Sequence, residues 1–209
     1  PRFTSNNQVL QRVVPERPVP EKKYPLYIVI DDVGYNLSQL DSFLSFPGKI
    51  TFAVLPGLPH TQESARRIHA AGKTVILHQP MEPLGQEDPG PGAIYSGMDK
   101  DTVYEILSRN LEEVPYAIGM NNHMGSKVTS DERMMEIILS FCRERDLLFL
   151  DSRTTPDAPV SEAIAKTINT NYIFRNSDFL DNEKNKESIL KAFSLGLGIA
   201  QKRGKAVMI

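Results

Sequence analysis

The sequence predicts an α/β fold built around a parallel β-sheet. Seven short apolar runs, typical of buried strands, alternate with longer segments whose apolar residues recur at helical spacing. Strand followed by helix with short connections implies right-handed crossovers between parallel strands. Closed on itself, such a sheet would resemble the (β/α)₈ barrel with one unit fewer, and left open it would be doubly wound. With 209 residues, of which 40% are hydrophobic, the chain is long enough for one substantial core.

The start of the chain predicts an extended segment. Prolines and charges mix between residues 14 and 21 without helical or strand periodicity. We therefore expect residues 1–23 to form a Pro-rich lead-in without chemistry and residues 24–209 to form a single domain, truncated at its C-terminus. The chain starts without Met and stops after an apolar run, so we expect a fragment whose missing ends could carry a signal or an anchor.

Each strand and helix has its own local signal. The predicted strands are apolar runs at 26–30, 50–55, 73–77, 116–120, 147–150, 172–174 and 206–209. The predicted helices cover 37–46, 61–71, 99–114, 129–146, 158–168 and 183–203. Asn36 and Asp99 can cap helices, Gly72 can end one, and Thr129 with Glu132 fits a capping box. Residues 79–98, rich in Pro and Gly, predict a long loop that we expect to border a functional site.

Composition excludes several kinds of partner. The formal net charge is −2 and no long basic run occurs, so neither nucleic acid nor an anionic membrane surface is expected as a partner. No stretch approaches the roughly 18 apolar residues of a membrane span. The single cysteine, Cys142, cannot form an internal disulfide and falls on an apolar helix face, where we expect it to fill space.

Polar side chains gather where the predicted strands end. Asp31 and Asp32 close the first run, His78 follows the third, and His123 follows the fourth. Ligands bind at the carboxyl ends of parallel strands in both candidate architectures. Two histidines and an aspartate form a three-ligand set with open positions, which suits Zn²⁺, with iron, cobalt or nickel as substitutes. The ordinary alternative is that each of these residues simply forms a hydrogen-bonded turn at the end of its strand.

Three segments carry a resemblance to a known family. Residues 30–34 (Ile-Asp-Asp-Val-Gly) resemble the Asp-Asp motif of the polysaccharide deacetylases, the NodB-homology superfamily. Residues 77–83 (Leu-His-Gln-Pro-Met-Glu-Pro) and 119–126 (Gly-Met-Asn-Asn-His-Met-Gly-Ser) are similar to its divergent branch. The resemblance covers the chain from Tyr24 to its end. It implies a distorted seven-stranded (β/α) barrel and metal-dependent removal of acetyl groups from N- or O-acetylated sugars.

The resemblance also implies roles for individual residues. Asp31 would be the general base, Asp32 and His78 metal ligands, and the metal zinc. The main family has a second His four residues after the first, where this chain has Glu82, so His123 would supply the missing imidazole. The family's closing motif places a His beyond the final strand, and this sequence ends at Ile209 before such a residue. A location outside the cytoplasm, periplasmic or secreted, is a further implication of the family.

Four more residues are candidates for contacts around the ligands or with the substrate: Glu82, Asn122, Asp151 and Arg153. Asp151 and Arg153 are expected to form a charge pair, either holding the base or substrate or lying as a surface salt bridge. The expected partner is a carbohydrate substrate. Two other functions stay open: a glycan-binding or cell-envelope protein that keeps the barrel and metal but has lost turnover, and a metal-dependent hydrolase of another amide or ester.

Overall fold

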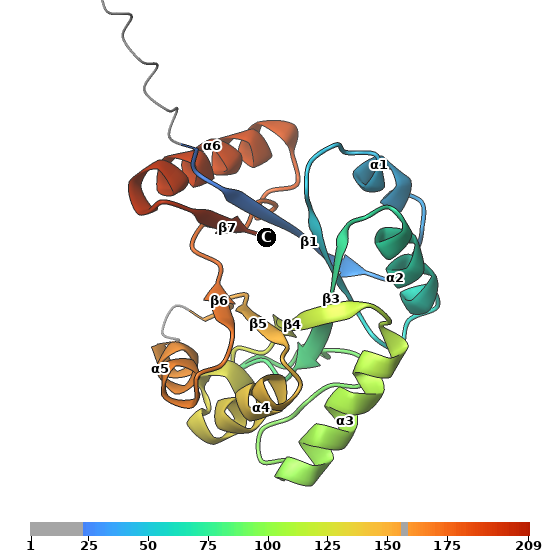
Figure 1. Cartoon of the computed structure of the whole chain (residues 1–209), viewed down its shortest axis with the longest axis vertical. Coiled ribbons are helices and arrows are strands. Elements are labelled where there is room, and N and C mark those ends of the chain that lie inside the picture. The colour runs from blue at the N-terminus through green and yellow to red at the C-terminus, as the bar shows by residue number, and fades with distance from the viewer. Residues whose placement is uncertain (1–22, 156–158) are drawn as a thin grey trace, which may run out of the picture.

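The computed structural model describes residues 23–155 and 159–209. The expected lead-in lies almost wholly outside these ranges. Strands and helices alternate along the described residues (Figure 1). The strands are β1 (Leu26–Val33), β2 (Thr51–Val54), β3 (Thr74–Met81), β4 (Ala117–Met124), β5 (Leu148–Asp151), β6 (Tyr172–Phe174) and β7 (Ala206–Met208). The helices are α1 (Leu40–Leu44), α2 (Thr61–Ala70), α3 (Lys100–Glu113), the 3-10 turn η1 (Val128–Ser130), α4 (Glu132–Glu144), α5 (Pro159–Ile168) and α6 (Lys186–Arg203).

The seven strands form one parallel sheet that curls into a nearly closed barrel. Its order is β6-β5-β4-β3-β2-β1-β7, and each strand pairs in parallel with its neighbours. The edge strands β6 and β7 are linked by Asn176, whose N–H donates to Val207 O (3.3 Å) and whose Oδ1 accepts from Val207 N–H (2.7 Å). The helices lie around the outside of the strands (Figure 1). The predicted distorted seven-stranded (β/α) barrel is confirmed.

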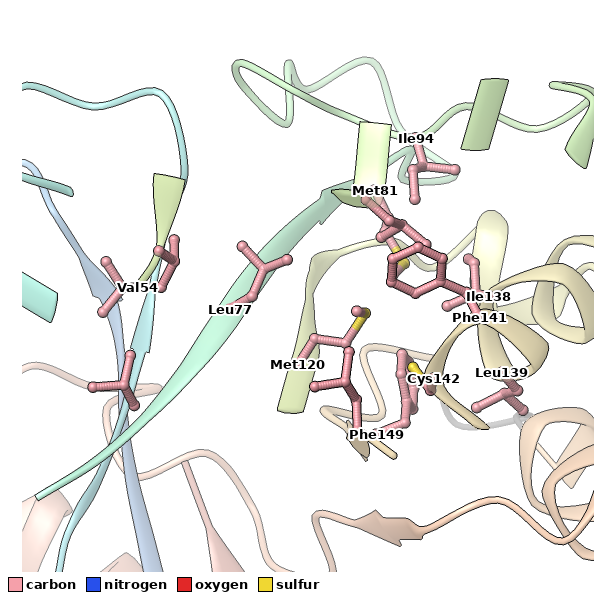
Figure 2. Packing of buried hydrophobic residues seen from close by; sticks show 14 of the residues in the cluster. Val54, Leu77, Met81, Ile94, Met120, Ile138, Leu139, Phe141, Cys142 and Phe149 are labelled. Carbon is pink, nitrogen blue, oxygen red and sulfur yellow. The ribbon is translucent and has the colours of Figure 1, made fainter. Parts of the chain in front are cut away.

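Two apolar clusters hold this barrel together. The inner cluster lies inside the barrel and joins residues of five strands and the residue that follows β7: Val29, Ala53, Ile76, Leu150, Val207 and Ile209. The outer cluster packs the opposite faces of the strands against the helices, and Figure 2 shows part of it. Its labelled members are Val54, Leu77, Met81, Ile94, Met120, Ile138, Leu139, Phe141, Cys142 and Phe149. Cys142 is buried in this cluster, as expected from its helix face.

Strand alternation decides which polar side chains face the barrel interior. Successive side chains of a strand point to opposite faces of the sheet. Ile76 belongs to the inner cluster and Leu77 to the outer one, so His78 faces inward. Met120 belongs to the outer cluster, which turns Asn121 and His123 inward on β4.

Several predicted boundaries were wrong, and the largest shifts are at the carboxyl ends of strands. β1, β3 and β4 continue three or four residues beyond the predicted apolar runs. In β3 and β4 the polar residues there stay paired with each other, whereas β1 reaches its pairing at Val33 across a shift in register that spans the two aspartates. β3 even accommodates Pro80: the pairing of β2 with β3 ends at Leu77, and beyond it the loop residue Ile94 needs only an acceptor from Pro80, because Ile94 N–H donates to Pro80 O (3.0 Å). Helix α1 starts only at Leu40, because the Asn36 side chain accepts from Ser38 N–H in a local turn.

The predicted helix caps had mixed outcomes. Asp99 caps α3 by accepting from Thr102 N–H (2.8 Å), as predicted. The expected capping box before α4 was wrong. Thr129 lies in η1, and Asp131 caps α4 by accepting from Met134 N–H (3.1 Å).

Candidate metal centre

Three side chains from three strands meet at the carboxyl end of the barrel. His78 and His123 face inward from β3 and β4, and Asp32 joins them from β1. Asp32 has a left-handed backbone with φ of 54°, a conformation that costs free energy in any residue with a Cβ. This turn departs from the extended strand geometry and brings the carboxylate beside both imidazole rings.

The ligand atoms of these residues form a small triangle. Asp32 Oδ1 lies 3.0 Å from His123 Nδ1 and 3.3 Å from His78 Nε2. The two nitrogens, His123 Nδ1 and His78 Nε2, are 3.1 Å apart. Among the described residues, Asp32, His78 and His123 are the group that could hold a metal ion.

The triangle fits a divalent metal. Atoms about 2.1 Å from one ion lie about 3.0 Å apart at a bond angle of 90° and about 3.4 Å apart at the tetrahedral angle. The observed separations of 3.0, 3.1 and 3.3 Å fall within that interval. Two imidazole nitrogens and one carboxylate oxygen are ligands that zinc and related ions accept, and three protein ligands leave further positions open.

The two neighbouring aspartates lie in different environments. A hydrogen bond from the His123 ring, together with the adjoining His78 ring, holds the pKa of Asp32 well below its usual range, so its ionised form is favoured. Burial raises the pKa of Asp31, an effect that the nearby His78 ring partly offsets. Asp31 Oδ2 lies 3.8 Å from His78 Nε2, further than Asp32 Oδ1 does. The pair thus separates into a ligand-like carboxylate and a more basic one beside it.

The first two of the four additional candidates, Glu82 and Asn122, form hydrogen bonds with groups other than the three ligands. Glu82 binds Lys127 Nζ through Oε1 (2.7 Å) and accepts from Ser96 N–H through Oε2 (2.8 Å). It therefore joins the loop after β3 to the segment after β4, where we had expected it to point toward the ligands. Asn122 accepts from Ser152 N–H (2.8 Å) and donates to Met124 O (2.7 Å), so it ties the end of β4 to the end of β5.

The expected charge pair between Asp151 and Arg153 was wrong. Leu150 points into the barrel, so Asp151 points to the outer face, where it is fully buried and accepts from Tyr172 Oη–H (2.7 Å). The Arg153 guanidinium instead pairs with Glu162 (3.3 Å) and stacks over the Phe174 ring. The same alternation explains why Asp151 lies away from the ligand triangle.

Asn121, which contacts His78, and Ser152, which contacts Asn121, were missed as site residues. Asn121 Oδ1 lies 2.9 Å from His78 Nδ1, and Asn121 Nδ2 donates to Ser152 Oγ (3.1 Å). The signal for Asn121 was present in the sequence, because it precedes His123 by two residues and so shares the inner face of one strand. Ser152 gave no such signal, since it follows the last residue of β5.

A hollow of about 160 Å³ opens beside the two aspartates, between β1 and α1. Apolar side chains such as Phe43 form part of its wall, and Asn36 and Gln39 add amide groups. Tyr35 lines the hollow with 59% of its surface exposed. A concave wall of apolar surface with a few polar groups is typical of small-molecule sites.

Comparisons with known proteins assign a family and a fold. The family model described as "Divergent polysaccharide deacetylase" matches residues 28–209. An uncharacterized protein of Escherichia coli strain K12, YibQ, is 34% identical over 184 residues, which cover 88% of this chain and 57% of that protein. An uncharacterized protein of Haemophilus influenzae Rd is 33% identical over 184 residues, covering 88% of this chain and 65% of the relative. The chain thus spans about three fifths of the length of these relatives.

Solved structures agree with this fold. An uncharacterized protein of Agrobacterium tumefaciens C58 superposes with a TM-score of 0.82 at 22% identity, covering 91% of this chain and 78% of that one. A protein of Enterococcus faecalis V583, proposed to cleave cellobiose phosphate, superposes with a TM-score of 0.58 at 12% identity, covering 88% and 78%. At these identities the likeness concerns the fold alone.

Proposed function

This chain belongs to the divergent polysaccharide deacetylase family, and we propose that it is a metal-dependent hydrolase that removes acetyl groups from acetylated polysaccharide or another carbohydrate. The observation that carries the proposal is the ligand triangle of Asp32, His78 and His123, with the more basic carboxylate of Asp31 next to it. Hydrolysis of an acetyl amide or ester needs an activated water and a polarised carbonyl, and this pairing could supply both.

Each residue has a distinct part in the proposed reaction. When bound, a divalent ion, zinc by our assignment, supplies a Lewis acid for the acyl carbonyl and lowers the pKa of a coordinated water. Asp32, His78 and His123 would hold that ion. Asp31 would accept the proton of the attacking water, because its raised pKa makes it a better base than an ordinary aspartate.

The hollow between β1 and α1 is a suitable place for part of a sugar. It adjoins both aspartates, and its exposed Tyr35 ring offers a flat apolar surface on which the apolar face of a pyranose can stack. The amides of Asn36 and Gln39 could bind hydroxyl groups, since an amide both donates and accepts hydrogen bonds. Carbohydrate is therefore the proposed partner. Among the described residues no helix has the length and apolar character needed to cross a bilayer.

The test of the proposal is acetate release with controlled metal content. The purified chain is stripped with a chelator, reloaded with Zn²⁺, Co²⁺ or Ni²⁺, and incubated with acetylated oligosaccharides and with small acetyl esters and amides. We expect release from the sugars only after reloading, with loss of release in Asp31→Asn. Asp101→Asn, an exposed aspartate in the first turn of α3, is the matched control and should behave as wild type. Release from the small compounds alone would support a hydrolase of another amide or ester.

A second candidate is a glycan-binding or cell-envelope protein that keeps the barrel and metal site without turnover. Glu82 favours it, because this residue stands where the main family has its second histidine and is engaged by Lys127 and Ser96. Binding of acetylated oligosaccharides without acetate release in the metal-loaded protein would favour this candidate. Both candidates would act outside the cytoplasm by our proposal, and fractionation of cells that express the full-length protein tests that location.

A further inference from the structure

Asn121 lies behind the ligand triangle in a position that is fully buried. It pairs in register with His78 across β3 and β4, and both side chains face the barrel interior. Its Oδ1 lies 2.9 Å from His78 Nδ1, while its Nδ2 donates to Ser152 Oγ (3.1 Å). His78 is itself only 2% exposed, so water cannot readily replace the amide at this nitrogen.

The chemistry of this contact restricts the imidazole. A neutral imidazole carries one N–H, and an amide oxygen can only accept a hydrogen bond. Contact with Asn121 Oδ1 therefore places the His78 proton on Nδ1 and leaves the lone pair of Nε2 free. That Nε2 atom is the one that lies 3.1 Å from His123 Nδ1 and 3.3 Å from Asp32 Oδ1.

The partner of the amide is also held in place. Ser152 N–H donates to Asn122 Oδ1 (2.8 Å), and Ser152 O accepts from Arg175 Nε (2.8 Å). With the main chain of Ser152 fixed at both groups, its hydroxyl offers an acceptor to Asn121 Nδ2. The Asn121 amide is thus oriented from the side opposite to His78.

We propose that Asn121 is a positioning residue that keeps His78 in the Nδ1–H tautomer and so prepares Nε2 to bind a divalent ion. Ligating histidines often use a carboxylate for this purpose. The neutral amide holds the ring without adding a third negative charge beside Asp31 and Asp32. The inference rests on the metal site of the proposed function and is independent of the substrate.

Two substitutions of Asn121 test whether the oxygen that accepts from His78 Nδ1 is needed, or the amide group as a whole. Asn121→Asp keeps an oxygen acceptor for His78 Nδ1, and the Ser152 hydroxyl can turn to donate to it. Asn121→Leu removes the acceptor. We expect Zn²⁺ affinity to fall about 10–100-fold in Asn121→Leu and to be retained in Asn121→Asp. The control is Asn110→Leu, since Asn110 is an equally buried amide that binds Gln79 and Gly92 O; its Zn²⁺ affinity should match wild type.

A second measurement uses the metal-free protein. The ¹⁵N shifts of the histidine ring report which nitrogen carries the proton, and thermal unfolding reports that each variant is folded. We expect Nδ1–H for His78 in wild type and Asn121→Asp, and a shift toward Nε2–H in Asn121→Leu. Should Asn121→Leu not fold, Ser152→Ala replaces it, with the same direction of change expected.

The outcomes distinguish this inference from the proposed function. A wild-type tautomer and wild-type Zn²⁺ affinity in folded Asn121→Leu would overturn the role of Asn121. If the wild-type protein itself does not bind Zn²⁺, the proposed metal centre fails, and the tautomer measurement alone decides whether Asn121 positions His78.

Discussion

The neighbouring aspartates allow metal binding and catalysis to be separated by one-residue changes. Asp32→Ala removes one corner of the ligand triangle, whose sides measure 3.0, 3.1 and 3.3 Å. Asp31→Asn keeps the shape of the side chain but removes the proposed base, and leaves all three ligand atoms in place. We therefore expect Asp32→Ala to lose metal and Asp31→Asn to retain it.

The expected losses of Zn²⁺ affinity in Asp32→Ala and of turnover in Asp31→Asn follow from the usual contributions of a metal ligand and of a general base. Zinc bound by four protein ligands gains about 10–16 kcal/mol, hence about 3 kcal/mol per ligand, so the loss of Asp32 should weaken Zn²⁺ binding about 100-fold or more. Loss of a general base costs about 10²–10⁴ in rate. Asp31→Asn should therefore reduce acetate release by that factor while its Zn²⁺ affinity stays close to that of wild type.

Competition with a chromophoric chelator measures Zn²⁺ affinity, and acetate release at saturating Zn²⁺ measures turnover. Asp101→Ala serves as the control for both, because Asp101 is an exposed residue of α3. If Asp31→Asn strips the metal while Asp32→Ala retains it, the assignment of the two aspartates is reversed. If neither substitution changes the affinity, the triangle is no metal site.

Three further predictions concern packing, the loop after β3 and pH. A Cβ on Gly119 would lie 2.4 Å from Leu148 O, so Gly119→Ala should lower Tm by about 2–10 °C through a cost of about 1–3 kcal/mol. The control is Gly198→Ala in α6, where the added Cβ meets nothing within 4 Å, and this variant should raise Tm slightly. Equal Tm shifts in Gly119→Ala and Gly198→Ala would refute the packing argument. Lys127→Met breaks the pair with Glu82 (2.7 Å) and should cost about 0–1 kcal/mol of stability with unchanged Zn²⁺ affinity; a fall in affinity would place Glu82 at the metal. Because the folded-state pKa of Asp31 is raised, the stability of the metal-free wild-type protein should fall as pH rises through that pKa. Metal-free Asp31→Asn should therefore have a higher Tm than wild type at neutral pH and the same Tm in acid. A lower Tm of Asp31→Asn at neutral pH would contradict the pKa shift.

The fold was predictable because each core strand has an apolar run. Strand six and the central parts of the other strands lie where the sequence places them. The ends of β3 and β4 were missed for a physical reason. Polar residues that face the barrel interior break the apolar pattern, yet the backbone pairing of His78 with Asn121 and of Pro80 with His123 continues through them.

The candidate site was predictable to the level of strand ends, and less so beyond them. Asp31, Asp32, His78 and His123 come together because the carboxyl ends of parallel strands meet at one end of a barrel. Asp151 also ends a strand, but the one-residue alternation that puts Leu150 inside puts its carboxylate outside. The direction of Glu82 depends on Lys127, which is 45 residues away in sequence, and local sequence carries no signal of such a contact.

The most direct test of the metal centre is anomalous diffraction from crystals of the chain grown with Zn²⁺. We predict a peak within bonding distance of Asp32 Oδ1, His78 Nε2 and His123 Nδ1, with Asp31 outside the coordination sphere. A peak bound by Asp31 in place of Asp32, or no peak at these three atoms at saturating Zn²⁺, would contradict the account.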